Sequence, residues 1–199
     1  MAWPRVFIAE SMSSKDFYVG ALDGRAAQHV LEIEHKEVQY RAVLDRLHLK
    51  KAIREATDGH FDIFQLSCHG NATGIILTDG EELTWEQLAK DLKSLASLTR
   101  GLVMASCNSG HRSLADALEK QNAKFGWIFG AKEKPGYTDS CLAWSVLFRD
   151  LRATKEVPKK ERVQRAIDSI NAIIPGEFVY RRWDSKQKRY LHYRGSSGR

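Results

Sequence analysis

A histidine and a cysteine each follow a buried, apolar segment of this 199-residue sequence, in positions suited to thiol chemistry. His69 comes after the strand-like segment 61–66, and Cys107 comes after the apolar run 102–104. Side chains that follow neighbouring parallel strands emerge at the same edge of a sheet, where open α/β sheets form their sites. A thiol nucleophile needs a partner that takes its proton and later protonates the leaving group, and imidazole titrates in the right range. We therefore expect His69 and Cys107 to form a catalytic pair.

The backbone around these two residues suits the stabilisation of a developing oxyanion. Gly70 has no Cβ and permits close approach, so its N–H and that of Cys107 can face the same oxygen atom. Each residue alone has an ordinary structural explanation, because a free cysteine is often a small buried side chain and a lone histidine often only hydrogen-bonds. Their occurrence together at two strand ends, beside glycine and small polar residues, favours catalysis.

A zinc site is the other chemistry that these segments suggest, with Cys68, His69, Cys107 and His111 as candidate ligands. Adjacent side chains on an extended strand point to opposite faces, so Cys68 and His69 are poorly placed to bind one ion. The sequence also contains neither a G-x-G-x-x-G segment after a strand nor a P-loop. We therefore predict no metal and no nucleotide or other cofactor, and we expect Cys68 and Cys141 to be structural.

Short apolar runs that alternate with amphipathic stretches must position these residues. Asp45 is placed to cap one helix, and Thr84 and Gln87 form the pattern of a capping box. Repeated strand–helix alternation predicts an α/β fold with a mainly parallel sheet covered by helices on both faces. The expected strands are 5–9, 38–43, 61–67, 74–78, 101–106 and 124–130, and the expected helices are 23–34, 45–56, 84–97, 113–121 and 138–151.

The last quarter of the chain differs from the rest in charge. Residues 152–199 contain 13 Lys and Arg against 5 Asp and Glu, whereas the whole chain has a net charge of +6. We divide the chain into an α/β domain, 1–151, and a basic extension, 152–199, which packs on it. The extension is predicted to contain a helix from Pro158 to Ile174, a hairpin of strands 178–183 and 189–193, and a disordered tail from 194. A basic region suits nucleic acid or another acidic partner, but a solvated helix face and hairpin are the favoured explanation.

Three blocks of the sequence resemble CHAT domains, which are caspase-like cysteine peptidases of the caspase–separase–gingipain group. Residues 61–70, followed by 77–80 and Leu83, resemble the His-Gly block of this family, and residues 104–110 resemble its nucleophile block. Residues 127–130 and 137–148 resemble the strand and helix that follow. The resemblance covers residues 61–151 and implies a caspase-like three-layer α/β/α sandwich.

The resemblance also implies a function, that of an endopeptidase which cleaves a protein partner through a Cys107 thioester. Cys107 is the implied nucleophile, His69 the proton-transfer group, and the backbone at Gly70 and Cys107 the oxyanion site. CHAT domains are commonly fused to sensor modules, and this chain has none, so a regulatory protein supplied in trans is expected. The Gln-Ala-Cys pattern of animal caspases is absent, so cleavage after aspartate is not expected. Asp139 stands where similar domains often carry an acidic residue that selects Arg or Lys, although it can equally cap its helix.

Two other functions stay open. One is a non-catalytic protein-interaction module on the same fold. The other is a TIR-like signalling domain, suggested by residues 5–11 followed by Asp16, which leaves His69 and Cys107 unexplained. Three widely separated cysteines and the absence of a signal peptide predict a reducing, cytoplasmic setting. No apolar run approaches the ~20 residues of a membrane span, so no membrane association is expected.

Overall fold

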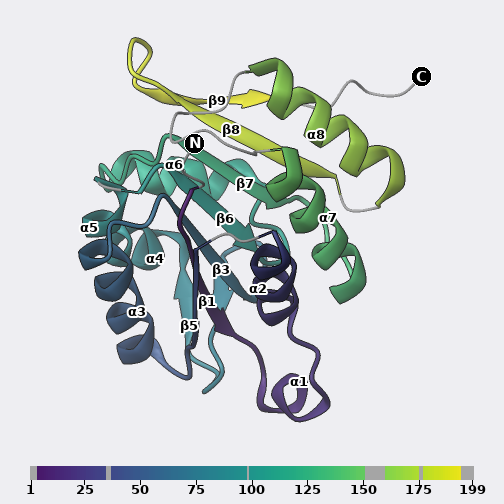
Figure 1. Cartoon of the computed structure of the whole chain (residues 1–199). Coiled ribbons are helices and arrows are strands. Elements are labelled where there is room, and N and C mark those ends of the chain that lie inside the picture. The colour runs from purple at the N-terminus through teal and green to yellow at the C-terminus, as the bar shows by residue number, and fades with distance from the viewer. Residues whose placement is uncertain (1–3, 35–36, 98, 151–159, 175–176, 194–199) are drawn as a thin grey trace.

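A single twisted sheet forms the centre of the protein (Figure 1). The computed structural model describes residues 4–34, 37–97, 99–150, 160–174 and 177–193. Within these residues the sheet has nine strands in the order β2-β1-β3-β6-β7-β8-β9, and β4 and β5 form a side hairpin on β3. The strands are β1 (Val6–Ser11), β2 (Val38–Ala42), β3 (Ile63–Gly70), β4 (Gly74–Ile76), β5 (Glu82–Thr84), β6 (Gly101–Ala105), β7 (Trp127–Ala131), β8 (Phe178–Asp184) and β9 (Arg189–Tyr193).

Helices cover both faces of this sheet, as Figure 1 shows. The described helices are α1 (Ser14–Val19), α2 (Asp23–Ile33), α3 (Arg46–Asp58), α4 (Trp85–Asp91), α5 (Lys93–Ala96), α6 (Arg112–Lys120), α7 (Tyr137–Asp150) and α8 (Lys160–Ile173). One hydrophobic core joins α3, α4, α5 and α6 to the sheet, and a second core joins α2, α7 and α8 to the opposite face. The predicted α/β/α sandwich is therefore confirmed.

Strands β2, β1, β3, β6 and β7 are parallel, and β8 and β9 continue the sheet in antiparallel pairing. The side chains of β1 alternate between the two cores, with Phe7 in one and Val6 and Ile8 in the other. This alternation explains why the parallel strands are apolar along their whole length, since both of their faces are covered.

The two predicted helix caps are confirmed. The carboxylate of Asp45 accepts the backbone N–H of His48 at 2.8 Å, and Thr84 and Gln87 form a complete capping box. The observed ends of several strands and helices differ from the predicted ones. Strand β3 runs on to Gly70, because its end pairs with β4. Strand β7 begins at Trp127 rather than at residue 124, because the N–H of Phe125 donates to the Tyr190 hydroxyl instead of joining a ladder. The expected helix 84–97 is divided at Leu92 into α4 and α5.

The C-terminal hairpin completes the sheet. Phe129 of β7 pairs with Tyr180 of β8, and its ring stacks on that of Phe178 with centroids 5.9 Å apart. Val163, Ile167 and Ile170 of α8 are buried in the same core. The predicted helix start at Pro158 and the predicted disordered tail from residue 194 lie outside the described residues. Among the described helices, none has the length and apolar character to cross a membrane.

A chain that ends at Asp150 is expected to lose its folded state. The truncation removes Phe178 and Tyr180 from the core and uncovers the hydrogen-bonding edge of β7. Loss of one buried aromatic side chain costs about 3–5 kcal/mol, whereas a whole domain is stable by only about 5–15 kcal/mol. Thermal denaturation followed by circular dichroism measures the effect, with a chain ending at Tyr193 as the control. Cooperative unfolding of both chains at the same Tm would contradict the prediction.

Candidate active site

The ends of β3 and β6 bring the His-Gly and Cys-Asn-Ser-Gly segments together. The two strands are parallel neighbours in the sheet, and Ser67 pairs with Ala105 in their ladder. Just beyond this pair, His69 and Cys107 both line a cavity of about 160 Å³. The other residues that line it are Met12, Asp23, Cys68, Ala105, Ser106, Pro135, Gly136, Tyr137 and Ser140. Residues expected from the sequence to meet at this edge therefore do so.

Gly70 lies against the backbone of the nucleophile segment. A Cβ atom built on Gly70 would be 2.6 Å from the carbonyl oxygen of Cys107 and 3.4 Å from its nitrogen. Real Cβ atoms do not approach backbone atoms so closely, so only glycine fits without movement of the chain. This close approach is what the predicted oxyanion site requires of Gly70.

An aspartate that sequence reasoning did not assign to the site contacts His69. The Nε2 atom of His69 lies 2.7 Å from Oδ2 of Asp16, which belongs to the short helix α1. Burial raises the pKa of Asp16, but hydrogen bonds from Ser13, His69 and Tyr137 outweigh this effect and bring the pKa to about 2. Asp16 is thus ionised at neutral pH, so it can orient the imidazole ring and stabilise its protonated form.

Cys107 is half-buried, and its surroundings favour the neutral thiol over the thiolate. Burial raises the pKa of Cys107, and the positive charge of Lys134 offsets this only in part. A thiol with a raised pKa attacks a carbonyl only when a base removes its proton. The imidazole ring of His69 lines the same cavity and is of a chemical type that can act as such a base. Burial also raises the pKa of Cys141, to about 11, and that of Cys68, which is packed in the core as well as lining the cavity. All three cysteines are free.

The loop that carries Cys107 is held against the end of β7. Asn108 adopts a left-handed conformation with φ of 61°, and its N–H donates to the carbonyl of Glu133. The N–H of Gly110 donates to the carbonyl of Ala131 at 2.7 Å. The buried Ser109 hydroxyl lies 3.0 Å from the carbonyl oxygen of Met104. These contacts fix the position of the thiol relative to the sheet, as a preorganised nucleophile requires.

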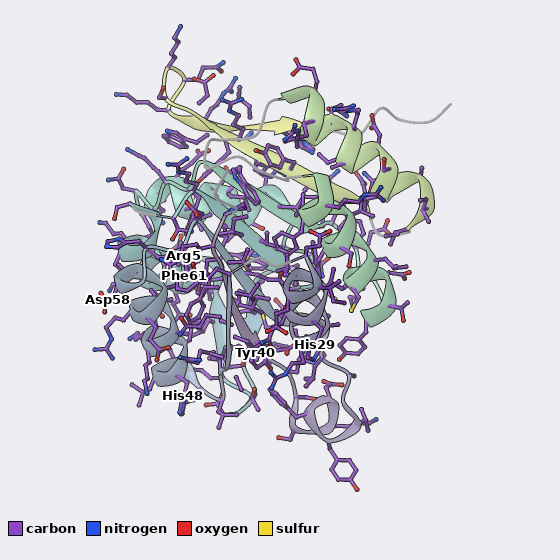
Figure 2. All side chains as sticks on the ribbon, viewed as in Figure 1. Arg5, His29, Tyr40, His48, Asp58 and Phe61 are labelled. Carbon is purple, nitrogen blue, oxygen red and sulfur yellow. The ribbon has the colours of Figure 1, made fainter. Side chains whose placement is uncertain are left out.

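The carboxyl groups of Glu10 and of Asp23, which lines the cavity, are both buried, and no pattern in the sequence indicated this pair. Glu10 of β1 accepts the N–H groups of Gly24 and Arg25 at the start of α2, and the Tyr40 hydroxyl at 2.7 Å. Tyr40 is part of β2, and its side chain is labelled in Figure 2. Asp23 accepts the indole N–H of Trp144 at 3.0 Å. Burial, and after it the negative charge of Glu10, raise the pKa of Asp23 to about 7. Glu10 has the larger set of donors, so Asp23 is the member of the pair that takes up a proton.

This pair predicts a specific pH dependence of stability. Asp23 holds a proton in the folded protein between about pH 4 and about pH 7, where the unfolded chain has released it. The unfolded state then binds fewer protons, so the free energy of unfolding falls as pH rises through this window. Asp23→Asn removes the titration and keeps an acceptor for Trp144. Urea denaturation from about pH 5 to about pH 8 should show the variant gaining stability relative to the wild type; parallel profiles would contradict the assignment.

Asp139, the residue expected to bind substrate, lies on the first turn of α7 and is not among the residues that line the cavity with Cys107. A carboxylate in the first turn of a helix is favourable for the helix itself. The carboxyl group that does line the cavity belongs to Asp23. Asp23 begins the predicted helix 23–34, but nothing in that pattern indicated that its side chain would reach the cavity.

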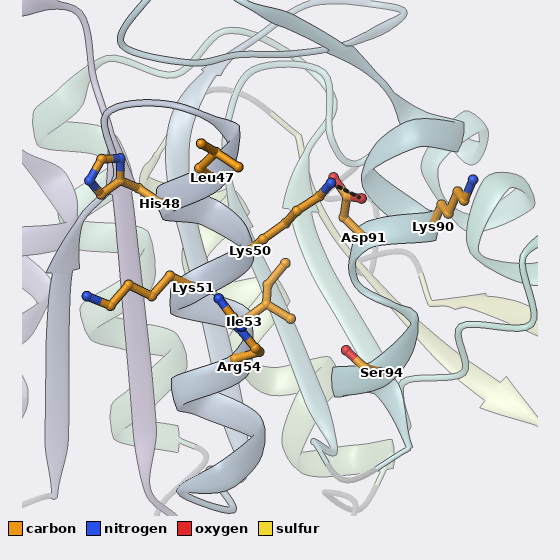
Figure 3. A pocket seen from close by; sticks show the side chains of 9 residues that line it. All are labelled: Leu47, His48, Lys50, Lys51, Ile53, Arg54, Lys90, Asp91 and Ser94. Carbon is orange, nitrogen blue, oxygen red and sulfur yellow. Dashed lines mark ion pairs between the residues drawn. The ribbon is translucent and has the colours of Figure 1, made fainter.

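A larger cavity of about 660 Å³ lies between α3 and the α4–α5 segment, and Figure 3 shows its lining. Its side chains are mainly basic, and they surround Asp91, which accepts Arg46 at 2.8 Å and lies 3.9 Å from Lys50. It contains no thiol among its lining residues. The larger cavity therefore lacks the residues that thiol chemistry requires. In the described part of the chain, no group of three or more His, Cys, Asp or Glu side chains is arranged to hold a metal ion.

Comparisons with known proteins identify the fold. No protein-family model and no curated protein matches the sequence. Among solved structures, the chain is similar to iotapain, a secreted C11 cysteine protease from Bacteroides thetaiotaomicron, at 11% identity and a TM-score of 0.56. That match covers 92% of this chain and 67% of the other. It is also similar to the complex of pro- and mature domains of RgpB from Porphyromonas gingivalis, at 10% identity and a TM-score of 0.51, covering 84% and 43% of the two chains. The chain has the caspase-like fold of these cysteine proteases.

Proposed function

We propose that the protein is a caspase-like cysteine endopeptidase of the CHAT type, which cleaves a peptide bond in a protein partner. The observation that carries this proposal is the shared cavity of His69 and Cys107, with His69 held by the ionised Asp16. A nucleophile, a base and a group that orients the base are the parts that thiol catalysis needs. The caspase-like fold supports the proposal, since the similar structures are cysteine proteases.

In the proposed mechanism, His69 removes the thiol proton as the sulfur of Cys107 attacks the scissile carbonyl carbon. The resulting oxyanion accepts hydrogen bonds from the N–H groups of Gly70 and Cys107. The C–N bond then breaks, His69 gives the proton to the leaving amine, and a thioester remains. Water attacks the thioester with His69 again as the base, and the carboxylic acid product leaves as the thiol is restored.

Asp16 acts as a positioning residue in this scheme. Its contact with Nε2 of His69 leaves Nδ1 as the ring nitrogen that exchanges the proton with the thiol. When His69 takes up the thiol proton, the negative charge of Asp16 stabilises the positively charged imidazole ring. Ser13 supports this arrangement, because its hydroxyl contacts the same carboxylate oxygen that faces the histidine.

We also propose that the enzyme prefers substrates with Arg or Lys directly before the scissile bond, and that Asp23 selects this side chain. Its carboxyl group lines the cavity beside Cys107, and its Oδ1 atom makes no hydrogen bond with the described residues. The positive charge of an arginine or lysine side chain entering the cavity would favour release of the proton from Asp23, and the carboxylate would then accept from that side chain in a charge-assisted pair.

A fluorogenic peptide library that varies the residue before the scissile bond tests both the peptidase activity and this preference. We expect cleavage after Arg or Lys, with kcat/KM for these peptides reduced about 10- to 100-fold by Asp23→Asn. Asp139→Asn is the matched control, because it removes the same charge from α7 outside the cavity. A preference altered by Asp139→Asn and left intact by Asp23→Asn would assign the specificity to Asp139 instead.

We further propose that the enzyme works in a reducing compartment such as the cytoplasm and responds to a regulatory protein supplied in trans. The free state of all three cysteines agrees with a reducing setting. The raised pKa of Cys107 agrees with a resting enzyme of low reactivity. Titration of candidate regulatory proteins into the peptide assay tests the proposed regulation, because an activator should raise kcat.

A further inference from the structure

Basic side chains of the C-terminal hairpin meet basic side chains from the start of α6 and the end of β7 in a separate cavity of about 450 Å³. Three parts of the chain form it, which are the start of α6, the residue after β7, and the β8–β9 hairpin. Its lining residues are His111, Arg112, Lys132, Arg181, Arg189, Tyr190, Leu191 and His192. Four of these are Arg or Lys, two are His, and none of the described lining residues is acidic.

The sheet register explains how the hairpin contributes two of these side chains. Arg181 of β8 is paired with His192 of β9, so both project from the same face of the hairpin. The same face carries Tyr190, whose N–H donates to Glu119 of α6 at 2.7 Å. Arg181 and His192 thus point toward α6, where Arg112 lies in the first turn.

Arg181 is the most buried positive charge in the lining of this cavity. It is only 7% exposed, and it lines the cavity while donating to the carbonyl of Gly110 at 2.9 Å. A guanidinium group that is always charged and shielded from water attracts an anion more strongly than an exposed one does. Carboxylates approach the rim of the cavity, where Asp116 accepts Arg112 at 2.9 Å and Glu177 accepts Lys132, but they do not line its interior.

We propose that this cavity binds a small molecule through a phosphate or diphosphate group. Guanidinium groups recognise phosphate oxygens in a bidentate manner, and the N-terminus of the nine-residue helix α6 adds the positive end of its dipole. The volume lies in the range of small-molecule sites. The site is distinct from the cavity of Cys107, because the two share no lining residue. It gives the basic hairpin a role that the proposed peptidase chemistry does not require.

Isothermal titration calorimetry of the full chain with inorganic pyrophosphate, ADP and adenosine tests the site. We expect pyrophosphate and ADP to bind in a 1:1 ratio, and adenosine not to bind. Arg112→Glu combined with Arg189→Glu should weaken pyrophosphate binding at least about tenfold, because each change removes a charge-assisted contact. Both side chains are exposed, so the fold should survive, and an unchanged Tm verifies this.

The matched control is Lys51→Glu combined with Arg54→Glu, which alters net charge equally at the exposed, basic cavity of Figure 3. This control should bind pyrophosphate as the wild type does. Equal loss of affinity in both double variants would overturn the proposal, because it would reveal general charge attraction. Absence of pyrophosphate binding, or equal binding of adenosine and ADP, would also overturn it. So would a single-stranded oligonucleotide that binds much more tightly than pyrophosphate and is weakened by the Arg112/Arg189 double variant, because the cavity would then belong to a nucleic-acid surface.

Discussion

Replacement of Cys107 by alanine is expected to abolish peptide hydrolysis and to leave the fold intact. Without the sulfur no thioester forms, and loss of a nucleophile in a comparable hydrolase costs about 10⁶-fold in kcat. The side chain is half-buried at a strand end, so its removal leaves little empty space in the core. Steady-state assays on a cleavable peptide, with circular dichroism on the same samples, measure the two effects separately.

The other two cysteines provide the controls for this experiment. Cys141→Ala and Cys68→Ala should keep most of the activity, because neither thiol is partnered by His69 in the proposed mechanism. Cys68 is the sharper control, since it lines the same cavity and is adjacent to His69 in the sequence. A Cys107→Ala variant with full activity, or a Cys68→Ala variant with none and an intact fold, would contradict the assigned nucleophile.

Removal of the imidazole in His69→Ala is expected to reduce kcat by several orders of magnitude. The thiol then has no base, and burial keeps its pKa above the ordinary value. Loss of a base that acts together with its nucleophile can cost nearly as much as loss of the nucleophile, about 10⁶-fold in a known case. The double variant His69→Ala/Cys107→Ala should be no worse than Cys107→Ala alone, because the two residues act as a unit.

Asp16→Asn separates positioning from proton transfer. It keeps a polar group 2.7 Å from His69 and removes the charge that stabilises the protonated ring. We expect a loss in kcat that is smaller than that of His69→Ala, with KM nearly unchanged, because Asp16 does not line the cavity. A change confined to KM, or no change at all, would remove Asp16 from the mechanism.

The sequence predicted the elements of this fold whose signals are local. The capping residues Asp45 and Thr84 determine helix starts through contacts three residues away, so pattern alone identified them. Apolar strand segments that end in His69 and Cys107 predicted one shared edge, and the parallel pairing of β3 and β6 brings them there. Strand ends were less predictable, because the length of β3 depends on pairing with β4, which no local pattern encodes.

Contacts between distant segments were beyond sequence reasoning. Asp16 meets His69 only because α1 follows β1 beside β3, and 53 positions separate the two residues in the chain. The pairing of Asp23 with Glu10 arises from the approach of α2 to β1, and either residue alone would be expected on the surface. The basic cavity gathers Arg112 and Arg181 from two regions whose charges looked unrelated in the sequence.

Covalent labelling with a peptidyl acyloxymethyl ketone, read out by mass spectrometry of the intact and digested protein, tests whether Cys107 is a nucleophile activated by His69. We expect one adduct per chain, located on Cys107, formed rapidly in the wild type and slowly in His69→Ala. We expect no adduct on Cys68 or Cys141 over the same period. Labelling of another cysteine, or a rate at Cys107 that His69→Ala leaves unchanged, would contradict the proposed peptidase and favour a non-catalytic interaction module on the same fold.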